Sequence, residues 1–416
     1  MTSIAYNYTP ASRVFQYAAI AAMTIILSNW QIYHNAVHGG PIPLIYYFIV
    51  FPIAIWAAFN KPNIDYISRN IIVYWLIVYA ISGAVWVTIY GEFSDEENRL
   101  IRARVLSLLI FLSGLFLVSI CETVYVVRML LVSSILAALN NWIDFLNPYL
   151  FYPVDFTNAN PGRGSGFYIN ANQAGQAVVA LCITLWPFIS NKYRNVLMLI
   201  MIFGVIPTFS RSAIIFSIFA VLITIWFGRA NAKQMLWVAF AAVLLVFIGT
   251  ALYDIAMNTD QFSTRDIEQR LDFFSTGGQA FDASANERKY VAAVAYDMFA
   301  QSPFFGNGIG STLLELRGRG VHNMYLVLLA EQGIIGLILF LIFLVLIFIR
   351  GFRFYRRGVN ANVTDIGVAL MLMAGLIAFF GLFSHTIFED PFSLLLLSIL
   401  LFYDSKNTYP NDLRVI

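Results

Sequence analysis

The segment 163–175, RGSGFYINANQAG, decides the fold class of this chain. It is a polar stretch rich in glycine and asparagine, and a long apolar run stands on each side of it. Inside hydrocarbon, the backbone N–H and C=O groups of such a loop need protein or water as hydrogen-bond partners. We therefore expect the loop to lie at one face of a membrane protein, where polar side chains meet the lipid boundary.

The composition agrees with this expectation. Of the 416 residues, 60% are hydrophobic and 12% are charged, and the mean hydropathy is +0.74. Soluble domains are roughly 45–50% apolar and about 25% charged, so the chain belongs among polytopic membrane proteins. The net charge of +2 offers no excess of positive charge for nucleic acid. Cys121 and Cys182 lie in or beside apolar runs without metal-ligand spacing, and we expect both to be core residues.

Long apolar runs predict an all-α polytopic membrane protein with about twelve transmembrane helices of about 20 residues each. No cleavable signal is expected, because the run after Arg13 is long enough to remain as a span. Only Glu122 and Thr123 separate the fourth run from the fifth, and only Ser210 and Arg211 separate the seventh from the eighth. Either pair forms two spans or one long or re-entrant element. The runs are 14–33, 42–59, 71–90, 105–121, 124–143, 174–189, 194–209, 212–228, 234–252, 327–349, 366–383 and 391–403.

Basic residues predict that both termini lie in the cytoplasm. Alternation from a cytoplasmic N-terminus puts most short basic loops inside, and RGFRFYRRG at 350–358 is the strongest of them. The segment 92–104 disagrees, because it falls outside yet carries Arg99, Arg102 and Arg104.

The same topology divides the chain into four parts. These are N-terminal membrane helices at 1–143, core membrane helices with a first outer loop at 144–252, a large outer loop at 253–326, and C-terminal membrane helices at 327–416. Only the large loop has room for a small folded subdomain. Within it, YVAAVAYDMFA has helix-like apolar spacing and is predicted to lie along the membrane surface, and FFGNGIG is predicted to be a glycine turn.

Arg211, in TFSRSA at 208–213, is the first candidate for chemistry. An arginine near the end of a span is costly and is normally paired, snorkelling or functional. Its guanidinium matches two phosphate oxygens at once. Two interpretations stay open, namely an anchor that snorkels to the membrane surface and a clamp for a diphosphate.

His322 is the second candidate. It precedes NMYLVLLAEQGIIG, which is predicted to begin a helix that leads into a span. The partial positive charge of a helix N-terminus opposes protonation of a nearby imidazole, and a neutral imidazole is what a general base requires. The alternative is a loop histidine that caps the helix.

The other histidines give weaker signals. His34 and His38 fall in a short outer loop with no acid close in sequence. His385 stands in SHTIFED beside Glu389 and Asp390, but one histidine and two acids on a short loop are weak evidence for a metal. We predict no metal site.

The large outer loop carries several arginines, and most of them are expected to be solvated or locally paired. Arg288 is the exception, because NERKYVAAVAYDMF places it at the start of a predicted helix, where free backbone N–H groups also meet phosphate. The GxGxG in 304–310 is not followed by a βαβ pattern and is no nucleotide signature. The chain has no Walker lysine motif, so ATP-driven transport is not indicated.

Four segments in this order resemble the O-antigen ligase and polymerase superfamily over residues 163–345. They are RGSGFYINANQAG, TFSRSAIIF, NERKYVAAVAYDMFAQSPFFGNGIGS and HNMYLVLLAEQGIIGLILF. The resemblance is specific in the Ser-Arg segment and in the His-Asn segment with its Glu-x-Gly-x-x-Gly. The first 140 residues agree with the family only in being hydrophobic spans.

The resemblance implies a GT-C-like helical membrane fold with a periplasmic active site and neither metal nor cofactor. Members move a glycan from undecaprenyl diphosphate to a hydroxyl, which belongs to lipid A–core oligosaccharide in ligases and to another lipid-linked repeat in polymerases. By matching motifs, Arg211 and Arg288 correspond to phosphate-binding arginines and His322 to the essential histidine. Arg163 lies in the matching loop with a less defined role. Arg265 has no motif of its own and is included because an outer-face arginine would complete the clamp.

The resulting hypothesis is an inverting, metal-independent O-antigen ligase in the bacterial inner membrane, with membrane lipids around it. An O-antigen or exopolysaccharide polymerase is the alternative within the class, and a non-catalytic lipid or polysaccharide transporter is the alternative outside it. A transporter is expected to line a through-going cavity with arginines, whereas this chain gathers its unusual groups on one face. The oligomeric state is not predicted.

Overall fold

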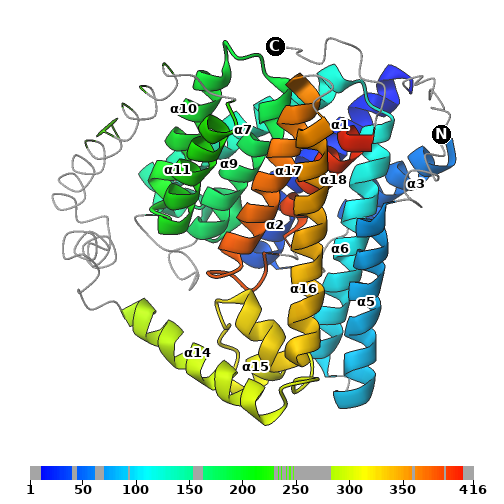
Figure 1. The fold of residues 1–416 in the computed structure, drawn as a ribbon, viewed down its shortest axis with the longest axis vertical. Coiled ribbons are helices and arrows are strands. Elements are labelled where there is room, and N and C mark those ends of the chain that lie inside the picture. The colour runs from blue at the N-terminus through cyan, green and yellow to red at the C-terminus, as the bar shows by residue number, and fades with distance from the viewer. Residues whose placement is uncertain are drawn as a thin grey trace.

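The computed structural model describes residues 11–39, 45–60, 70–91, 94–152, 163–228, 283–357, 361–387 and 390–405, with single residues between 233 and 247. Over this part of the chain the regular structure is helical, and the helices form one bundle with a smaller group of elements at one end (Figure 1). The run 234–252 lies mainly outside the described residues.

Five of the described helices are long and apolar enough to cross a membrane. They are α5 (Ile71–Tyr90), α6 (Asp95–Ser119), α7 (Thr123–Leu146), α16 (Met324–Arg357) and α17 (Ala361–Phe380). Shorter apolar helices pack among them: α1 (Arg13–Leu27), α3 (Phe51–Asn60), α10 (Arg194–Val205), α11 (Arg211–Trp226) and α18 (Pro391–Ser405). The structure agrees with a polytopic membrane protein, while the number twelve and the GT-C-like arrangement stay predictions.

The centre of the bundle is α9 (Ala171–Leu185), whose residues from Ala174 to Leu185 are all buried. It packs against α7, α10, α11, α17 and α18, which form much of the main apolar core. Glycine and alanine positions allow this close approach. A Cβ on Gly175 would lie 2.6 Å from the Cβ of Ala213, so α9 and α11 touch near their first turns.

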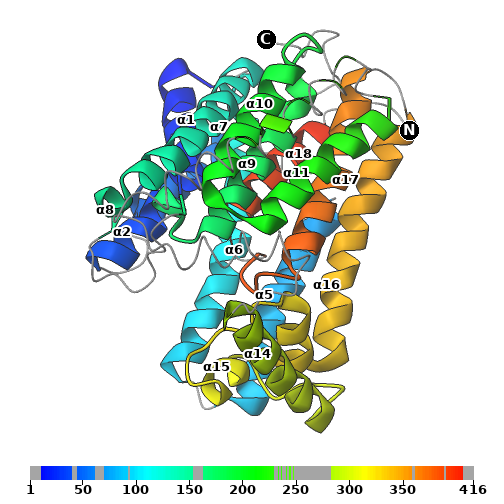
Figure 2. The same cartoon turned by 90° about the vertical axis from the view of Figure 1, so that its left-hand side faces the viewer.

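The bundle has two ends that differ in their elements. At the end that we call the loop end, the Met324 N–H donates to the Gly381 carbonyl at 2.7 Å, which joins the start of α16 to the end of α17. At the opposite end, Arg350 donates to the Asn70 side chain at 3.1 Å, which joins α16 to the start of α5. Figure 2 shows α14 (Ala283–Gln301) and α15 (Ser311–Glu315) beyond the loop end of the bundle.

The elements beyond the loop end have a small apolar core of their own. It joins α14 to the segment after α15 and to the first turns of α16, through Val291, Ala295, Met298, Leu316, Val321 and Ala330. The predicted helix in YVAAVAYDMFA is therefore confirmed. Its Val291, Ala295 and Met298 pack on protein, whereas Tyr290 and Tyr296 are exposed.

The predicted span 327–349 lies within α16, which is long and apolar enough to cross a membrane, but the helix is broken at Gly333 (φ 63°, ψ −161°). The turn at 303–308 fills the break: the N–H of Ile334 donates to the Pro303 carbonyl, and the N–H of Gly308 donates to the Glu331 carbonyl. A Cβ on Gly333 would lie 2.3 Å from the Phe304 carbonyl oxygen. The positive φ and this close approach both require glycine.

Gly333→Ala is therefore expected to destabilise the protein by about 1–3 kcal/mol or more. The measurement is thermal unfolding of the purified protein in detergent. Gly375→Ala is the matched control, since a Cβ there meets nothing closer than 3.8 Å inside α17 and alanine favours helix. Equal melting temperatures for the two variants would contradict the requirement for glycine at the break.

The prediction of an outer loop at 92–104 is also wrong, because α6 already begins at Asp95. Ser94 and Glu97 form a capping box in which each side chain binds the backbone N–H of the other residue. This arrangement satisfies two N–H groups at the helix start. Arg99, Arg102 and Arg104 are thus helical residues. The basic residues that disagree with the charge rule lie on a helix, where a loop was predicted.

The first apolar run is likewise two helices. Asn29 adopts a left-handed conformation (φ 56°) that ends α1 and begins α2 (Trp30–His38). The Asn29 side chain donates to the Phe167 carbonyl at 3.0 Å. His34 and His38 therefore lie on a helix packed beside the 163–170 segment, where a short loop was predicted.

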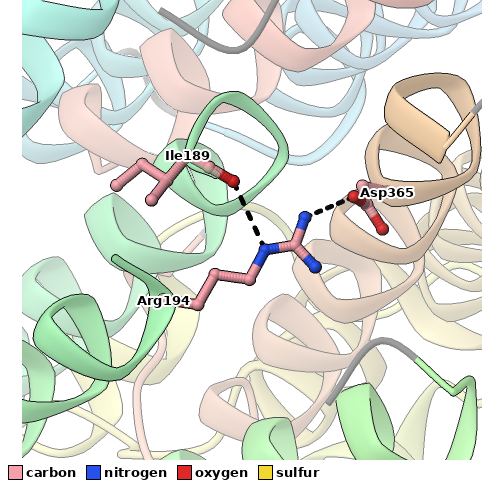
Figure 3. Close-up of polar contacts among 3 residues, drawn as sticks. All are labelled: Ile189, Arg194 and Asp365. Carbon is pink, nitrogen blue, oxygen red and sulfur yellow. Dashed lines mark hydrogen bonds and ion pairs between the residues drawn. The ribbon is translucent and has the colours of Figure 1, made fainter. Parts of the chain in front are cut away.

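A buried ion pair joins α10 to α17 at the opposite end of the bundle (Figure 3). The Arg194 guanidinium binds the Asp365 carboxylate, and both side chains are 1% exposed. Arg194 also donates to the Ile189 carbonyl at 3.4 Å and lies over the Trp186 ring at 4.8 Å. The pair fixes the start of α10 against the start of α17.

Candidate functional site

The polar loop predicted from 163–175 finds protein partners for its backbone, as the membrane argument requires. The carboxylate of Asp144 accepts the N–H groups of Ser165 and Gly166 at 2.7 and 2.8 Å. The N–H of Gly164 donates to the Pro207 carbonyl at 2.7 Å. The loop is thus bound on one side to the end of α7 and on the other to the turn between α10 and α11.

Arg163 fixes this loop from inside the protein. Its side chain is 7% exposed. The guanidinium donates from Nε to the Thr208 carbonyl at 3.0 Å and from Nη2 to the Asn172 side chain at 3.1 Å. These bonds hold the turn before Arg211 against the first turn of α9. Direct binding of diphosphate by Arg163 stays a prediction, and its observed contacts brace the neighbouring elements.

Arg211 is the first residue of α11 and is half-buried. A short 3₁₀ turn, η4 (Ile206–Thr208), and the left-handed Phe209 (φ 46°) reverse the chain ahead of it. Ser210 caps α11 by accepting the N–H of Ala213 at 3.3 Å. The seventh and eighth apolar runs are therefore two helices.

The first turns of α9 and α11 lie side by side at the loop end. Asn170 caps α9 by accepting the N–H of Asn172 at 2.8 Å, and the Gly175–Ala213 contact brings the two helix starts together. Each helix start carries partial positive charge. With Arg211 as the first residue of α11, this part of the loop end favours an anion.

His322 stands just before α16, as predicted, and remains exposed. It does not cap the helix. Asn323 is the cap, because its side-chain oxygen accepts the N–H groups of Tyr325 and Leu326 at 3.0 and 3.1 Å. The imidazole is left available for other contacts.

The pKa of His322 is lowered, chiefly by partial burial of the ring and then by the positive charge of Arg288, while Glu287 acts in the opposite direction. The prediction of a neutral imidazole is therefore supported. Burial and Arg288 are the leading causes of the lowered pKa, whereas the sequence analysis attributed the neutral form to the helix start. Arg288 and His322 are thus close enough to interact.

Arg288 lies later in its helix than the sequence indicated. Helix α14 begins at Ala283, so Arg288 occupies its second turn, beyond the N–H groups that a helix start leaves free. The interpretation that phosphate meets Arg288 together with these N–H groups is therefore wrong. Its half-buried side chain instead lies within electrostatic reach of His322.

The segment between α17 and α18 links the start of α9 to His322. The sequence did not predict this role. Gln173, in the first turn of α9, donates to Thr386 at 3.3 Å and to Asp390 at 2.9 Å. Further along the same segment, the His385 ring lies 5.9 Å from the His322 ring, centroid to centroid. The segment is therefore a physical bridge from the start of α9 to His322.

Two of the residues named in the sequence analysis lie outside the part of the chain that the structure describes. Arg265 lies outside the described residues, so its part in a clamp stays a prediction. Glu389 also lies outside them. Among the described residues no group of three or more His, Cys, Asp or Glu side chains could hold a metal ion, and Asp390 instead accepts the amide of Gln173.

Comparison with known families bears on the same region. Residues 196–341 match the family model described as O-antigen ligase. The match contains Arg211, Arg288, His322 and the break in α16, while the loop at 163–175 and His385 lie outside it. No curated protein matches the chain. Residues 196–341 are thus similar to the O-antigen ligase family, which is consistent with the O-antigen ligase and polymerase superfamily.

Proposed function

We propose that this protein is a membrane glycosyltransferase that moves a glycan from undecaprenyl diphosphate to a hydroxyl acceptor at the periplasmic face of the bacterial inner membrane. One observation carries the proposal. An exposed histidine with a lowered pKa lies beside Arg288, at the same end of the bundle as Arg211, and all three residues fall within the matched segment 196–341.

The arginines serve the donor. Arg211 and Arg288 bind the diphosphate, and the starts of α9 and α11 add partial positive charge. Fixed positive charge stabilises the diphosphate as it leaves, and electrostatic stabilisation of this kind supplies several kcal/mol, about 2.7–4 for one well-placed donor. Arg265 is proposed to complete the clamp. Arg163 holds the 163–175 loop, which faces the clamp.

His322 serves the acceptor. Its neutral imidazole takes the proton of the acceptor hydroxyl, and the oxygen attacks the anomeric carbon of the donor sugar. The new C–O bond forms as the bond to the diphosphate oxygen breaks, and undecaprenyl diphosphate leaves with the bonding electrons. A single displacement inverts the anomeric carbon. The protonated His322 then releases its proton to solvent, which its exposure allows.

Lipid A–core oligosaccharide is the acceptor in the ligase form of this proposal, and a second lipid-linked repeat is the acceptor in the polymerase form. Both use the same donor and the same base. The deciding test is transfer by the purified protein with undecaprenyl diphosphate-linked glycan, with and without lipid A–core. Product only with lipid A–core establishes the ligase, and longer lipid-linked glycan without it establishes the polymerase. No product from folded protein in either case favours the transporter.

The pH dependence of transfer tests the base. Since the pKa of His322 in the free protein is lowered below its ordinary 6.5, kcat/KM is expected to rise with pH and reach its plateau at a lower pH than an unperturbed histidine would give. Arg288→Gln removes a positive charge and therefore raises the pKa of His322, so the acidic limb should move to higher pH. A limb that stays in place in this variant would show that Arg288 does not act on His322.

Arg211→Lys tests the clamp. Lysine keeps the charge but loses the planar pair of donors that match two phosphate oxygens. We expect kcat/KM for the donor to fall by about tenfold to a hundredfold, corresponding to about 1.4–2.8 kcal/mol. Arg317→Lys is the control, because Arg317 is an exposed arginine after α15. Full activity in Arg211→Lys would remove the main support for a bidentate clamp.

A further inference from the structure

A small polar cavity lies behind the candidate base, between α5, α6, α15 and the first turns of α16. Its volume, counted as space open to the centre of a water molecule, is about 40 Å³. Tyr79, Arg104, Thr312, Glu331 and His385 contribute to its walls. About 10–15 Å³ of such space is enough to hold one water molecule, so the cavity has room for bound water.

Two charged side chains of this cavity, Arg104 and Glu331, are buried, and Arg104 is incompletely bonded among the described residues. Arg104 is 4% exposed, and its Nε and Nη1 atoms have no hydrogen-bond partner among the described residues. Its guanidinium lies over the Tyr79 ring at 4.3 Å. Glu331 is also 4% exposed, and its carboxylate accepts the Thr312 hydroxyl at 2.5 Å. Buried donors are almost always satisfied by protein or water, so water is the partner that this cavity offers to Arg104.

His385 stands between this cavity and His322. The His385 Nδ1 atom is buried and has no hydrogen-bond partner among the described residues. The backbone of the His322 loop packs against the same ring, because a Cβ on Gly320 would be 2.8 Å from His385 Cε1 and 3.4 Å from Nδ1. The two imidazole rings are 5.9 Å apart at an angle of 56°.

The segment that carries His385 is held at both ends. Gln173 binds Thr386 and Asp390, and the start of α16 binds Gly381. His385 is therefore fixed relative to α9 and to the His322 loop at once.

Burial and nearby charges keep His385 neutral. The pKa of His385 is lowered to about 4, chiefly by burial of the ring and then by the positive charges of His322 and Arg99. The other ionisable groups nearby are Arg104, Glu287, Arg288, Glu331 and Asp390 on the packed elements. A neutral imidazole has one donor and one acceptor nitrogen, so it contacts two different partners at once.

We propose that His385 is a positioning residue for His322, which holds the His322 imidazole on one side and binds water of the Arg104–Glu331 cavity on the other. The contact between the two rings is direct or runs through one water molecule. By fixing the tautomer of His322, it determines which nitrogen faces the acceptor hydroxyl. His385 takes up no proton in the reaction, and the proton stays on His322 until solvent removes it. The catalytic consequence rests on the function proposed above, whereas the contact itself does not.

The contact is tested without any assay of activity. The chain has four histidines, so full-length protein labelled with ¹⁵N-histidine in lipid bilayers gives a spectrum that single His→Gln variants can assign. We expect His385 to remain neutral from pH 8 to pH 5 and His322 to show one dominant neutral tautomer. In His385→Phe, which keeps an aromatic ring without its nitrogens, His322 should show both tautomers. An unchanged His322 spectrum, or titration of His385 near pH 6.5, overturns the proposal.

Kinetics provide the second measurement. His385→Phe is expected to lower kcat by about tenfold to a hundredfold with little change in KM for the donor, and His385→Gln should recover most of the loss because its amide also donates and accepts. His34→Gln, on α2, is the control. If both His385 variants lose kcat equally while folding normally, the residue has only a packing role. If the wild-type protein transfers no glycan but the spectra behave as expected, the proposed function fails and the positioning contact stands.

Discussion

His322→Gln is expected to lower kcat for glycan transfer by about 10²- to 10⁴-fold, the range that general-base catalysis contributes. Glutamine fills similar space and keeps a hydrogen-bonding group, but it cannot accept a proton at neutral pH. In the proposed mechanism Arg211 and Arg288 bind the donor, so the KM for the donor should change little. The measurement is initial rate against donor concentration with a fixed excess of acceptor.

The comparison variant for this result is His34→Gln, because His34 is a histidine on α2 in contact with His38. Its activity should match that of the unmodified protein. A His322→Gln protein that is correctly folded and retains more than a tenth of the original kcat would exclude His322 as the base. The acceptor proton would then have to leave through another group.

Arg194→Met is expected to destabilise the protein by about 3–5 kcal/mol, because it leaves the Asp365 carboxylate without its cation inside the bundle. Both side chains are 1% exposed, so water cannot take the place of the guanidinium without opening the contact between α10 and α17. Removing one partner of a buried ion pair lowers the free energy of unfolding by more than the intact pair contributes to it. The measurement is the free energy of unfolding in mixed micelles.

A double variant separates the two contributions. In Arg194→Met with Asp365→Leu, neither buried charge remains, and replacement of a buried ion pair by apolar side chains is often neutral or stabilising. We expect much of the lost stability to return. Lys192→Met, at an exposed position two residues earlier, should leave stability nearly unchanged. A double variant less stable than Arg194→Met would show that the pair itself holds the helices together.

The apolar runs predict most of the described helices because composition and length alone determine whether a segment suits hydrocarbon. They do not reveal where a helix breaks. Gly333 follows only two polar residues, Glu331 and Gln332, inside an apolar stretch. The cause of the break is the close approach of the 303–308 turn, which is distant in sequence. The same limit applies to Asn29, whose left-handed conformation is supported by a bond to the Phe167 carbonyl.

The start of α6 shows a signal that was present and overlooked. Ser94 and Glu97 have the spacing of a capping box, which marks a helix start, yet the charges after them indicated a loop. The burial of Arg104 was not predictable in this way, because the groups around it come from α5, α15 and α16. A charge counted as part of a surface loop is in fact inside the protein.

For the candidate site, local motifs placed His322 before a helix and Arg211 at the first turn of another. They did not place Arg288 correctly, since the helix begins five residues before it. Nor did they connect His385 with His322, which are 5.9 Å apart in space and more than sixty residues apart in the chain. Pairings of this kind follow from the packing of α16 against α17.

The break at Gly333 also separates two mechanical functions of α16. In a continuous helix, adding or deleting one residue turns everything beyond it by about 100° and moves it by about 1.5 Å. Here the turns that follow His322 are held by the 303–308 turn, and the long segment from Ile334 to Arg357 begins a new helical phase. A residue added or deleted within that segment therefore does not turn or shift the helical turns that follow the histidine.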